Sequence, residues 1–246
     1  MEKSGRIMEV FLITGTSRGI GKALAIRALE KGAKVYGYSR NCTIEHSNYT
    51  HTSVDFSDLK QVEKIDFPDG VFTSVILINN AGSLGEMKHV GKLTENGVVS
   101  TYHINTIAPI LLSNKFVAKY RNVQAKRIVL NISSGAAIHL SDGWSIYSST
   151  KAALDTFTRV AQLEQELDNT GIRFLSVHPG IIETKMQEEI RKNQQEDFSN
   201  VEYFRELKST GQLKTPEHIA KLLLDIVEGN YEPEDVVFSL RNHPQY

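Results

Sequence analysis

Tyr147 and Lys151 are residue types that can share a proton, and they stand four positions apart in the chain. Residues at this spacing lie on one face of a helix, so the phenol and the ammonium can point into one cleft. The pKa of a free tyrosine is too high for proton exchange at neutral pH, and lowering it by ~3 units takes ~4 kcal/mol of preferential phenolate stabilisation. A buried ammonium is one source of that stabilisation. The pair predicts acid–base chemistry, although many such pairs are only surface neighbours.

Two serines, Ser133 and Ser134, directly follow an apolar stretch that we expect to be a strand. Open α/β folds bind their ligands at the carboxyl edge of the sheet, where both hydroxyls would lie. Adjacent strand residues face opposite sides, so only one of the two can meet a substrate. The residues alone leave that choice open.

A glycine-rich segment, residues 14–21, follows the first apolar run and opens the first helical pattern. Glycines let the backbone turn tightly and approach a phosphate, while the helix N-terminus offers free N–H groups and a positive dipole end. The spacing is G-x-x-x-G-x-G rather than the usual G-x-G-x-x-G. The context nevertheless predicts a nucleotide site. Its candidate residues are Gly15, Ser17, Arg18, Gly19, Ile20 and Gly21.

The end of the second strand indicates which nucleotide binds. An acid there takes the ribose hydroxyls of NAD, whereas a nearby arginine suits a 2′-phosphate. This chain has no acid at that point; Arg40 follows the strand, and Arg18 lies in the glycine turn. Two arginines flanking an adenosine site favour NADP(H), although either one can be an ordinary surface residue. Asp55 is a candidate for the adenine edge or, equally, for the cap of the next helix.

The elements that must position these residues alternate between apolar strands and amphipathic helices. Expected strands cover residues 10–14, 34–38, 52–55, 74–78, 127–132, 173–177 and 236–238. This alternation predicts one α/β domain over residues 1–246, a doubly wound parallel sheet of about seven strands with helices on both faces, of Rossmann type. The charged segment 183–210 is longer than a normal connection. It is expected to be either a substrate lid or a pair of solvated helices.

Composition excludes several classes of function. Lysine and arginine total 28 against 29 acids, which argues against a nucleic-acid partner. The single cysteine, Cys42, excludes an internal disulfide and a multi-cysteine metal site, and no metal is predicted. No apolar run approaches the ~18 residues of a membrane helix. Residues 1–9 carry charges where a signal peptide is apolar. We therefore expect a cytoplasmic enzyme or small-molecule binder.

Three histidines invite a metal or catalytic-triad interpretation. His103, His139 and His178 stand on separate expected elements, and the sequence shows no evident acid partner for them. We expect them to be structural.

Over residues 10–238 the chain resembles the short-chain dehydrogenase/reductase family, because the family's motifs occur in order. The family places its serine thirteen residues before its tyrosine, and this spacing selects Ser134 over Ser133. The other matching positions are the glycine turn, Asn79, Asn80, Ala81 and Gly82 after the fourth strand, Asn105 in the long fourth helix, Tyr147, Lys151, Pro179, Gly180 and Thr184.

This resemblance implies that NADPH delivers hydride to a carbonyl carbon. Tyr147 would protonate the carbonyl oxygen, and Ser134 would hydrogen-bond the developing alkoxide. Lys151 would orient the nicotinamide ribose and, with the positive ring of oxidised nicotinamide, lower the tyrosine pKa. Asn105 would anchor a water that reprotonates Lys151. Further implied cofactor contacts are Asn80, Ala81 and Gly82 on the adenosine side and Pro179, Ile182 and Thr184 at the carboxamide. The family also implies a homodimer or homotetramer.

A closer similarity to the benzil reductase and sepiapterin reductase branch rests on residues 131–137, 143–147, 163–166 and 179–187. With Trp144 and Met186 as substrate-pocket candidates, the apolar loops predict a bulky ketone or aromatic 1,2-diketone as substrate. Sepiapterin reductases carry a C-terminal aspartate that grips the pterin, and Leu240 stands at that place. A pterin reductase is one alternative. The other is a regulator that binds NADP(H) without turnover, which the intact catalytic set disfavours.

Overall fold

The computed structural model describes residues 8–246 and contains one seven-stranded, wholly parallel sheet with the order β3-β2-β1-β4-β5-β6-β7. The stretch 1–7, which carries most of the signal-peptide argument, lies outside the described residues. The strands are β1 (Met8–Thr14), β2 (Lys34–Ser39), β3 (Tyr49–Ser53), β4 (Phe72–Asn79), β5 (Lys126–Ile132), β6 (Ile172–His178) and β7 (Val237–Ser239). The predicted doubly wound α/β fold is confirmed.

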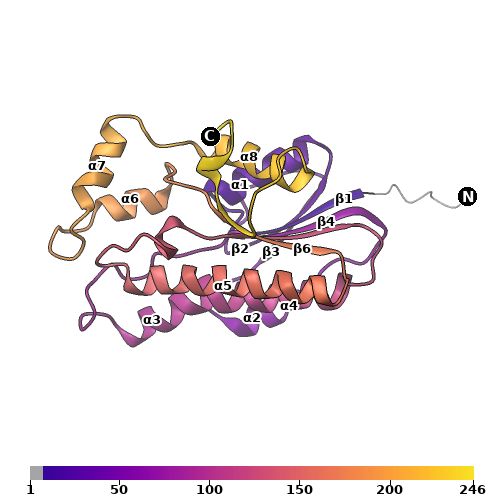
Figure 1. The fold of residues 1–246 in the computed structure, drawn as a ribbon, viewed down its shortest axis with the longest axis horizontal. Coiled ribbons are helices and arrows are strands. Elements are labelled where there is room, and N and C mark those ends of the chain that lie inside the picture. The colour runs from indigo at the N-terminus through magenta and orange to yellow at the C-terminus, as the bar shows by residue number, and fades with distance from the viewer. Residues whose placement is uncertain (1–7) are drawn as a thin grey trace, which may run out of the picture.

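Helices cover both faces of this sheet (Figure 1). One face carries α1 (Gly19–Glu30) and α8 (Pro216–Glu228). The opposite face carries α2 (Leu59–Glu63), α3 (Glu95–Tyr102), α4 (Ala108–Tyr120) and α5 (Ser145–Leu167). Alternate residues of β1 supply the two cores: Phe11 packs with the α1 and α8 side, and Leu12 with the α2 and α4 side. This double burial explains why the central strands are almost wholly apolar.

β3 begins three residues earlier than the pattern predicts, at Tyr49 rather than Thr52. Its sequence is polar, but the strand pairs with β2 from Val35↔Tyr49 onward. The Tyr49 ring lies across Gly37, where a Cβ would stand 2.1 Å from the tyrosine oxygen. Backbone pairing and this close packing, rather than apolar periodicity, therefore define the strand.

The segment between β6 and α8 leaves the sheet and returns to it. It forms α6 (Lys185–Arg191) and α7 (Val201–Ser209), which extend beyond the carboxyl ends of the strands (Figure 1). A bridge between Ile182 and Lys214 joins the two ends of this excursion. The inner sides of both helices are buried in a third apolar cluster, so they are not simply solvated. We call residues 184–213 the lid segment, after the substrate lid predicted for residues 183–210; a lid function stays a prediction.

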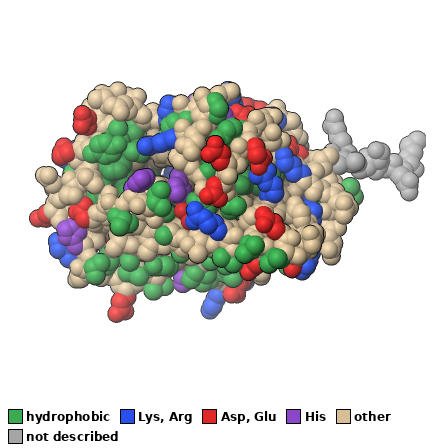
Figure 2. All heavy atoms as spheres, viewed as in Figure 1, with side chains coloured by type: hydrophobic (Ala, Val, Ile, Leu, Met, Phe, Trp, Pro, Cys, Tyr) green, Lys and Arg blue, Asp and Glu red, His purple; other side chains and the backbone are tan. Residues whose placement is uncertain are grey.

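The face shown in Figure 2 carries interspersed acidic and basic side chains, with hydrophobic side chains gathered over α6 and α7. Within residues 8–246, no helix combines the length and apolarity that a bilayer crossing requires.

Candidate active site

Tyr147 and Lys151 lie in the first two turns of α5, at the carboxyl edge of the sheet. Both are buried, with 7% and 4% of their surface exposed. The Lys151 Nζ donates to the Ile132 carbonyl at 2.8 Å and lies 5.9 Å from the centre of the Tyr147 ring. The first turns of α5 thus hold Tyr147 and Lys151 together in a buried site.

The end of β5 resolves the choice between the two serines. The Ser134 hydroxyl accepts from the Ala136 amide at 3.1 Å and faces the Tyr147 phenol, whose pKa it lowers. Ser133 points the other way and donates to the Lys151 carbonyl at 3.4 Å. The geometry therefore places Ser134 with Tyr147, as the family spacing predicts.

The pKa of Tyr147 moves in the direction opposite to the expected one. Burial raises this pKa, and the hydrogen bond from Ser134 only partly opposes it. The reason is geometric, because the Lys151 ammonium is bonded to a backbone carbonyl rather than aimed at the phenol oxygen. Burial lowers the pKa of Lys151 to about 8, while the Asp155 carboxylate raises it. Tyr147 in this arrangement is a protonated donor.

Asn105 lies in a π-helical turn, η1 (His103–Ile107), between α3 and α4 rather than in a regular helix. Such turns are often found at functional sites. Its Oδ1 accepts from the Ser83 amide at 2.8 Å, and its Nδ2 donates to the Ser83 carbonyl at 2.8 Å and to Thr150 Oγ1 at 3.1 Å. A Cβ on Gly82 would stand 3.7 Å from both Asn105 Oδ1 and Lys151 Nζ. The Asn105 side chain therefore links the loop at Ser83 to α5 at Thr150, beside Lys151. Its role in anchoring a water stays a prediction.

The glycine turn is shaped for close approach. Gly15 has φ +75°, and a Cβ on Gly21 would stand 2.5 Å from the Gly15 carbonyl oxygen. Thr14 Oγ1 accepts from the Asn80 and Ala81 amides, each at 2.9 Å. The Asn80 side chain donates to the Thr14 carbonyl at 2.9 Å. The segment after β4 therefore holds the turn in place.

Arg18 and Arg40 are both exposed at this end of the sheet. Thr43 Oγ1 donates to the Ser17 carbonyl at 3.0 Å, which ties the loop after β2 to the glycine turn. The two arginines therefore belong to connected loops that flank one surface.

Asp55 does not cap a helix; that alternative is wrong. Its carboxylate accepts from the Ser57 amide at 2.9 Å and hydroxyl at 2.7 Å, and Asp58 caps α2 instead. The Ser57 bonds, with a smaller contribution from the Arg40 charge, hold the pKa of Asp55 below its usual value. An acid is therefore near Arg40 in space, although the β2 sequence contains none.

The loop after β6 lies over the glycine turn. The Thr184 methyl group stands 3.5 Å from the place of a Cβ on Gly19. Ile182 is buried, and Pro179 is buried directly after the strand. The residues predicted to bind the cofactor phosphate therefore lie next to those predicted to bind the nicotinamide carboxamide.

Trp144 joins the lid segment to the catalytic pair. Its ring centre lies 5.7 Å from that of Tyr147, 4.9 Å from that of Phe198 in a stacked arrangement and 5.6 Å from that of Phe204. Met186 is half-buried against the same cluster. The sequence interpretation missed Phe198 and Phe204, although their apolar spacing within a charged stretch is a signal of an inward face.

Two further expectations change. His178 has an acid partner, because its Nε2 lies 2.8 Å from Asp155 Oδ2 in a buried pair. The sequence could not show this, since 23 positions separate the two residues.

Leu240 is fully buried in the core cluster on the α1 and α8 side. Its apolar character follows from packing there, so it says little about the substrate.

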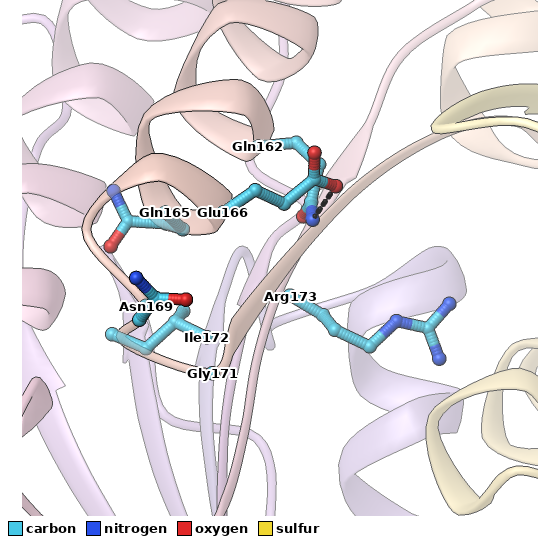
Figure 3. A pocket seen from close by; sticks show the side chains of 7 residues that line it. All are labelled: Gln162, Gln165, Glu166, Asn169, Gly171, Ile172 and Arg173. Carbon is cyan, nitrogen blue, oxygen red and sulfur yellow. Dashed lines mark hydrogen bonds between the residues drawn. The ribbon is translucent and has the colours of Figure 1, made fainter.

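A hollow at the other end of α5, shown in Figure 3, carries no part of this set. Gln162 Nε2 donates to Glu166 Oε1 at 2.8 Å, and Gln162 Oε1 accepts from the Phe174 amide at 2.7 Å. These polar groups already have protein partners. Tyr147 and Lys151 lie at the opposite end of α5 from this hollow.

Comparison with known proteins agrees with this geometry. The family model described as short chain dehydrogenase matches residues 9–195. Benzil reductase ((S)-benzoin forming) from Bacillus subtilis (strain 168) is 38% identical over 92% of this chain and 96% of its own length. The protein of the same name from Bacillus cereus is 32% identical over 95% and 99%. The crystal structure of the KRED1-Pglu enzyme superposes with a TM-score of 0.77 at 26% identity, covering 93% of this chain and 98% of that one.

Proposed function

The chain belongs to the short-chain dehydrogenase family, in its benzil reductase branch, and on that premise we propose that it is an NADPH-dependent carbonyl reductase. The family consists of oxidoreductases that act on carbonyl and alcohol groups with nicotinamide cofactors. The observation that carries the proposal is the convergence of Ser134, Tyr147 and Lys151 beneath an aromatic cluster.

The cofactor fits the residues of the glycine turn. A Cβ on Gly15 would stand 2.8 Å from the Asn80 side chain, so only a bare backbone leaves the turn open to a phosphate. In this proposal Gly15, Ser17, Arg18, Gly19, Ile20, Gly21, Arg40, Asp55, Asn80, Ala81, Gly82, Pro179, Ile182 and Thr184 hold the dinucleotide. When bound, the nicotinamide supplies the hydride.

The reaction of the chain's own residues follows from their hydrogen bonds. The Ser134 hydroxyl and the Tyr147 phenol bind the substrate's carbonyl oxygen, and Tyr147 donates its proton to that oxygen as negative charge develops. The raised pKa of Tyr147 keeps the phenol protonated for this step. The positive charge of Lys151 stabilises the resulting phenolate, which then regains a proton at the expense of Lys151. Lys151 recovers this proton from solvent at the corner that Asn105 holds.

NADPH rather than NADH is proposed because Arg18 and Arg40 flank the expected adenosine surface. Guanidinium groups bind phosphate through charge-assisted, often paired hydrogen bonds. Asp55 is held by Ser57 and lies close enough to Arg40 for the two charges to interact. It can therefore orient Arg40 toward a 2′-phosphate.

A bulky aromatic ketone or 1,2-diketone such as benzil is the proposed substrate. Trp144, Phe198 and Phe204 pack together beside Tyr147, and Met186 completes an apolar lining. Burial of apolar surface contributes roughly 25 cal/mol per Å², so poorly hydrated rings gain most here. We propose that the lid segment forms one wall of this pocket. A pterin remains the alternative substrate, since Leu240 no longer argues against it.

We also propose a homo-oligomer. Val160, Leu163 and Leu167 are 48%, 55% and 73% exposed on one helix, α5. Such a row is typical of a surface that a second chain covers.

The decisive experiment follows NADPH oxidation with benzil, sepiapterin and a short β-keto ester. We expect the highest kcat/KM with benzil, and a higher value with NADPH than with NADH. Equal values for the two cofactors would contradict the NADPH assignment. Tight NADPH binding without turnover of any carbonyl would instead favour the regulator.

A further inference from the structure

The mechanism above leaves one buried acid unused. Asp155 lies one helical turn after Lys151 on α5 and is 4% exposed. Its Oδ1 accepts from the Ser176 hydroxyl at 2.6 Å, and its Oδ2 lies 2.8 Å from His178 Nε2. His178 is the last residue of β6 and directly precedes Pro179.

A buried carboxylate is costly unless hydrogen bonds and charge compensate it. Burial alone would raise the pKa of Asp155, but hydrogen bonds from His178, Ser176 and Ser133 outweigh it and hold this pKa below the ordinary value. Asp155 is therefore ionised at neutral pH. The protein maintains a negative charge in its interior, beside the buried lysine.

We propose that Asp155, fixed by His178 and Ser176, is a positioning residue that keeps Lys151 in its ammonium form. The proposal rests on the proposed function, because it assigns a task to Lys151 in that reaction. Within residues 8–246, the Lys151 Nζ donates to a single acceptor, the neutral Ile132 carbonyl. Asp155 stands four positions after Lys151 on the same face of α5, and both side chains are buried, so the carboxylate charge acts on the ammonium through the interior.

The direction of the pH effect follows from the groups that face the pair. Lys151 and Tyr147 come from α5, and His178 and Ser176 come from β6. Ser133 directly follows β5. Burial lowers the pKa of Lys151 to about 8, and Asp155 acts against this. Without the carboxylate that pKa falls further, so Lys151 loses its proton at lower pH.

The test is Asp155→Asn, which removes the charge at nearly constant volume. Lysine labelled with ¹³C at Cε is titrated by NMR, and the Lys151 signal is assigned by its loss in Lys151→Met. We expect a midpoint near pH 8 in the parent and one lower by about one pH unit in the variant, the usual effect of a neighbouring charge. The limb on which kcat/KM falls as pH rises should move in the same direction.

Two controls separate this role from a structural one. His178→Gln keeps a nitrogen donor for the carboxylate and should leave the midpoint in place. Asp142→Asn removes an exposed carboxylate with the same kinds of partner, the Ser199 hydroxyl at 2.7 Å and His89 Nε2 at 3.1 Å, and should also leave it in place. Asp155→Ser serves as a second charge-removing variant if the asparagine chain does not fold.

An unchanged Lys151 midpoint in a folded Asp155 variant would overturn the proposal. Because the NMR titration needs neither cofactor nor substrate, it does not depend on turnover. If the parent protein is inactive but the Lys151 midpoint still shifts in Asp155→Asn, the effect of Asp155 on Lys151 is supported and the proposed function is refuted.

Discussion

The corner that holds Tyr147 and the lid segment above it are built differently. At the corner around Tyr147, Asn105, Lys151 and Ser134 are fixed by hydrogen bonds to backbone groups of Ser83, Ile132 and Ala136. The lid segment is held by stacked rings, as between Trp144 and Phe198, and by ion pairs at the surface. A framework fixed by directional bonds suits chemistry that needs one geometry, whereas apolar packing can adapt to different substrates.

Both regions contain an aspartate that binds a serine and a histidine, but the two sets differ in burial. Asp155 binds a serine and a histidine in the interior, and Asp142 binds Ser199 and His89 at the rim of the lid segment. The second set is exposed, so water replaces its bonds at little cost. Burial, rather than residue identity, decides which set can influence the reaction.

Among the variants proposed, Tyr147→Phe should cause the largest loss of kcat, and it tests the corner around Tyr147. Removing the proton donor is expected to lower kcat by ~10²–10⁴ while fold and cofactor affinity are retained. Steady-state kinetics with benzil, and NADPH binding by fluorescence, measure the two quantities. A variant with a tenth or more of parental turnover, when chemistry is rate-limiting, would exclude the assigned role.

Arg40→Asp tests the cofactor end of the same framework. The variant loses a charge-assisted contact and places a second acid near Asp55, so KM for NADPH should rise about tenfold. KM for NADH should change far less. Arg121→Asp is a matched control at an exposed site that pairs with Asp168. An equal rise for both cofactors would show that Arg40 does not read the 2′-phosphate.

Trp144→Leu tests the lid side of the comparison. The variant loses the proposed aromatic contact between Trp144 and a benzil ring; such a contact contributes about 0.5–1.5 kcal/mol beyond burial, so kcat/KM for benzil should fall by about two- to tenfold. A small ketone should lose less, because it cannot reach the ring. The two substrates are assayed in parallel, and equal losses would place Trp144 outside the pocket.

Asp142→Asn should give the smallest effect. Its bonds to Ser199 and His89 lie at the surface, and exposed contacts of this kind contribute about 0–1 kcal/mol. We expect KM for benzil to rise no more than about fivefold with kcat unchanged. A drop in kcat would show that the rim of the lid segment also affects the chemical step.

The sequence predicts the parallel sheet, and it predicts that Tyr147 and Lys151 share one face of a helix, because these signals are local; the catalytic roles of the two residues stay predictions. The glycine turn, the Tyr147 and Lys151 spacing and the apolar strands each occupy a few neighbouring positions. It does not predict the Asp155 and His178 pair or the stacking of Trp144 on Phe198, since these arise when distant segments pack together. Asn105 shows both sides: its position follows from a motif, whereas its π-helical turn and its bonds to Ser83 depend on the folded context.

The difference between the two regions is tested most directly by one ratio, kcat/KM for benzil divided by kcat/KM for a small ketone. It is measured with NADPH in the parent, in Tyr147→Phe and in Trp144→Leu. If the framework performs the chemistry and the lid side selects the substrate, Tyr147→Phe lowers both values and leaves the ratio unchanged, while Trp144→Leu lowers the ratio. A ratio that changes in Tyr147→Phe and stays constant in Trp144→Leu would contradict this division.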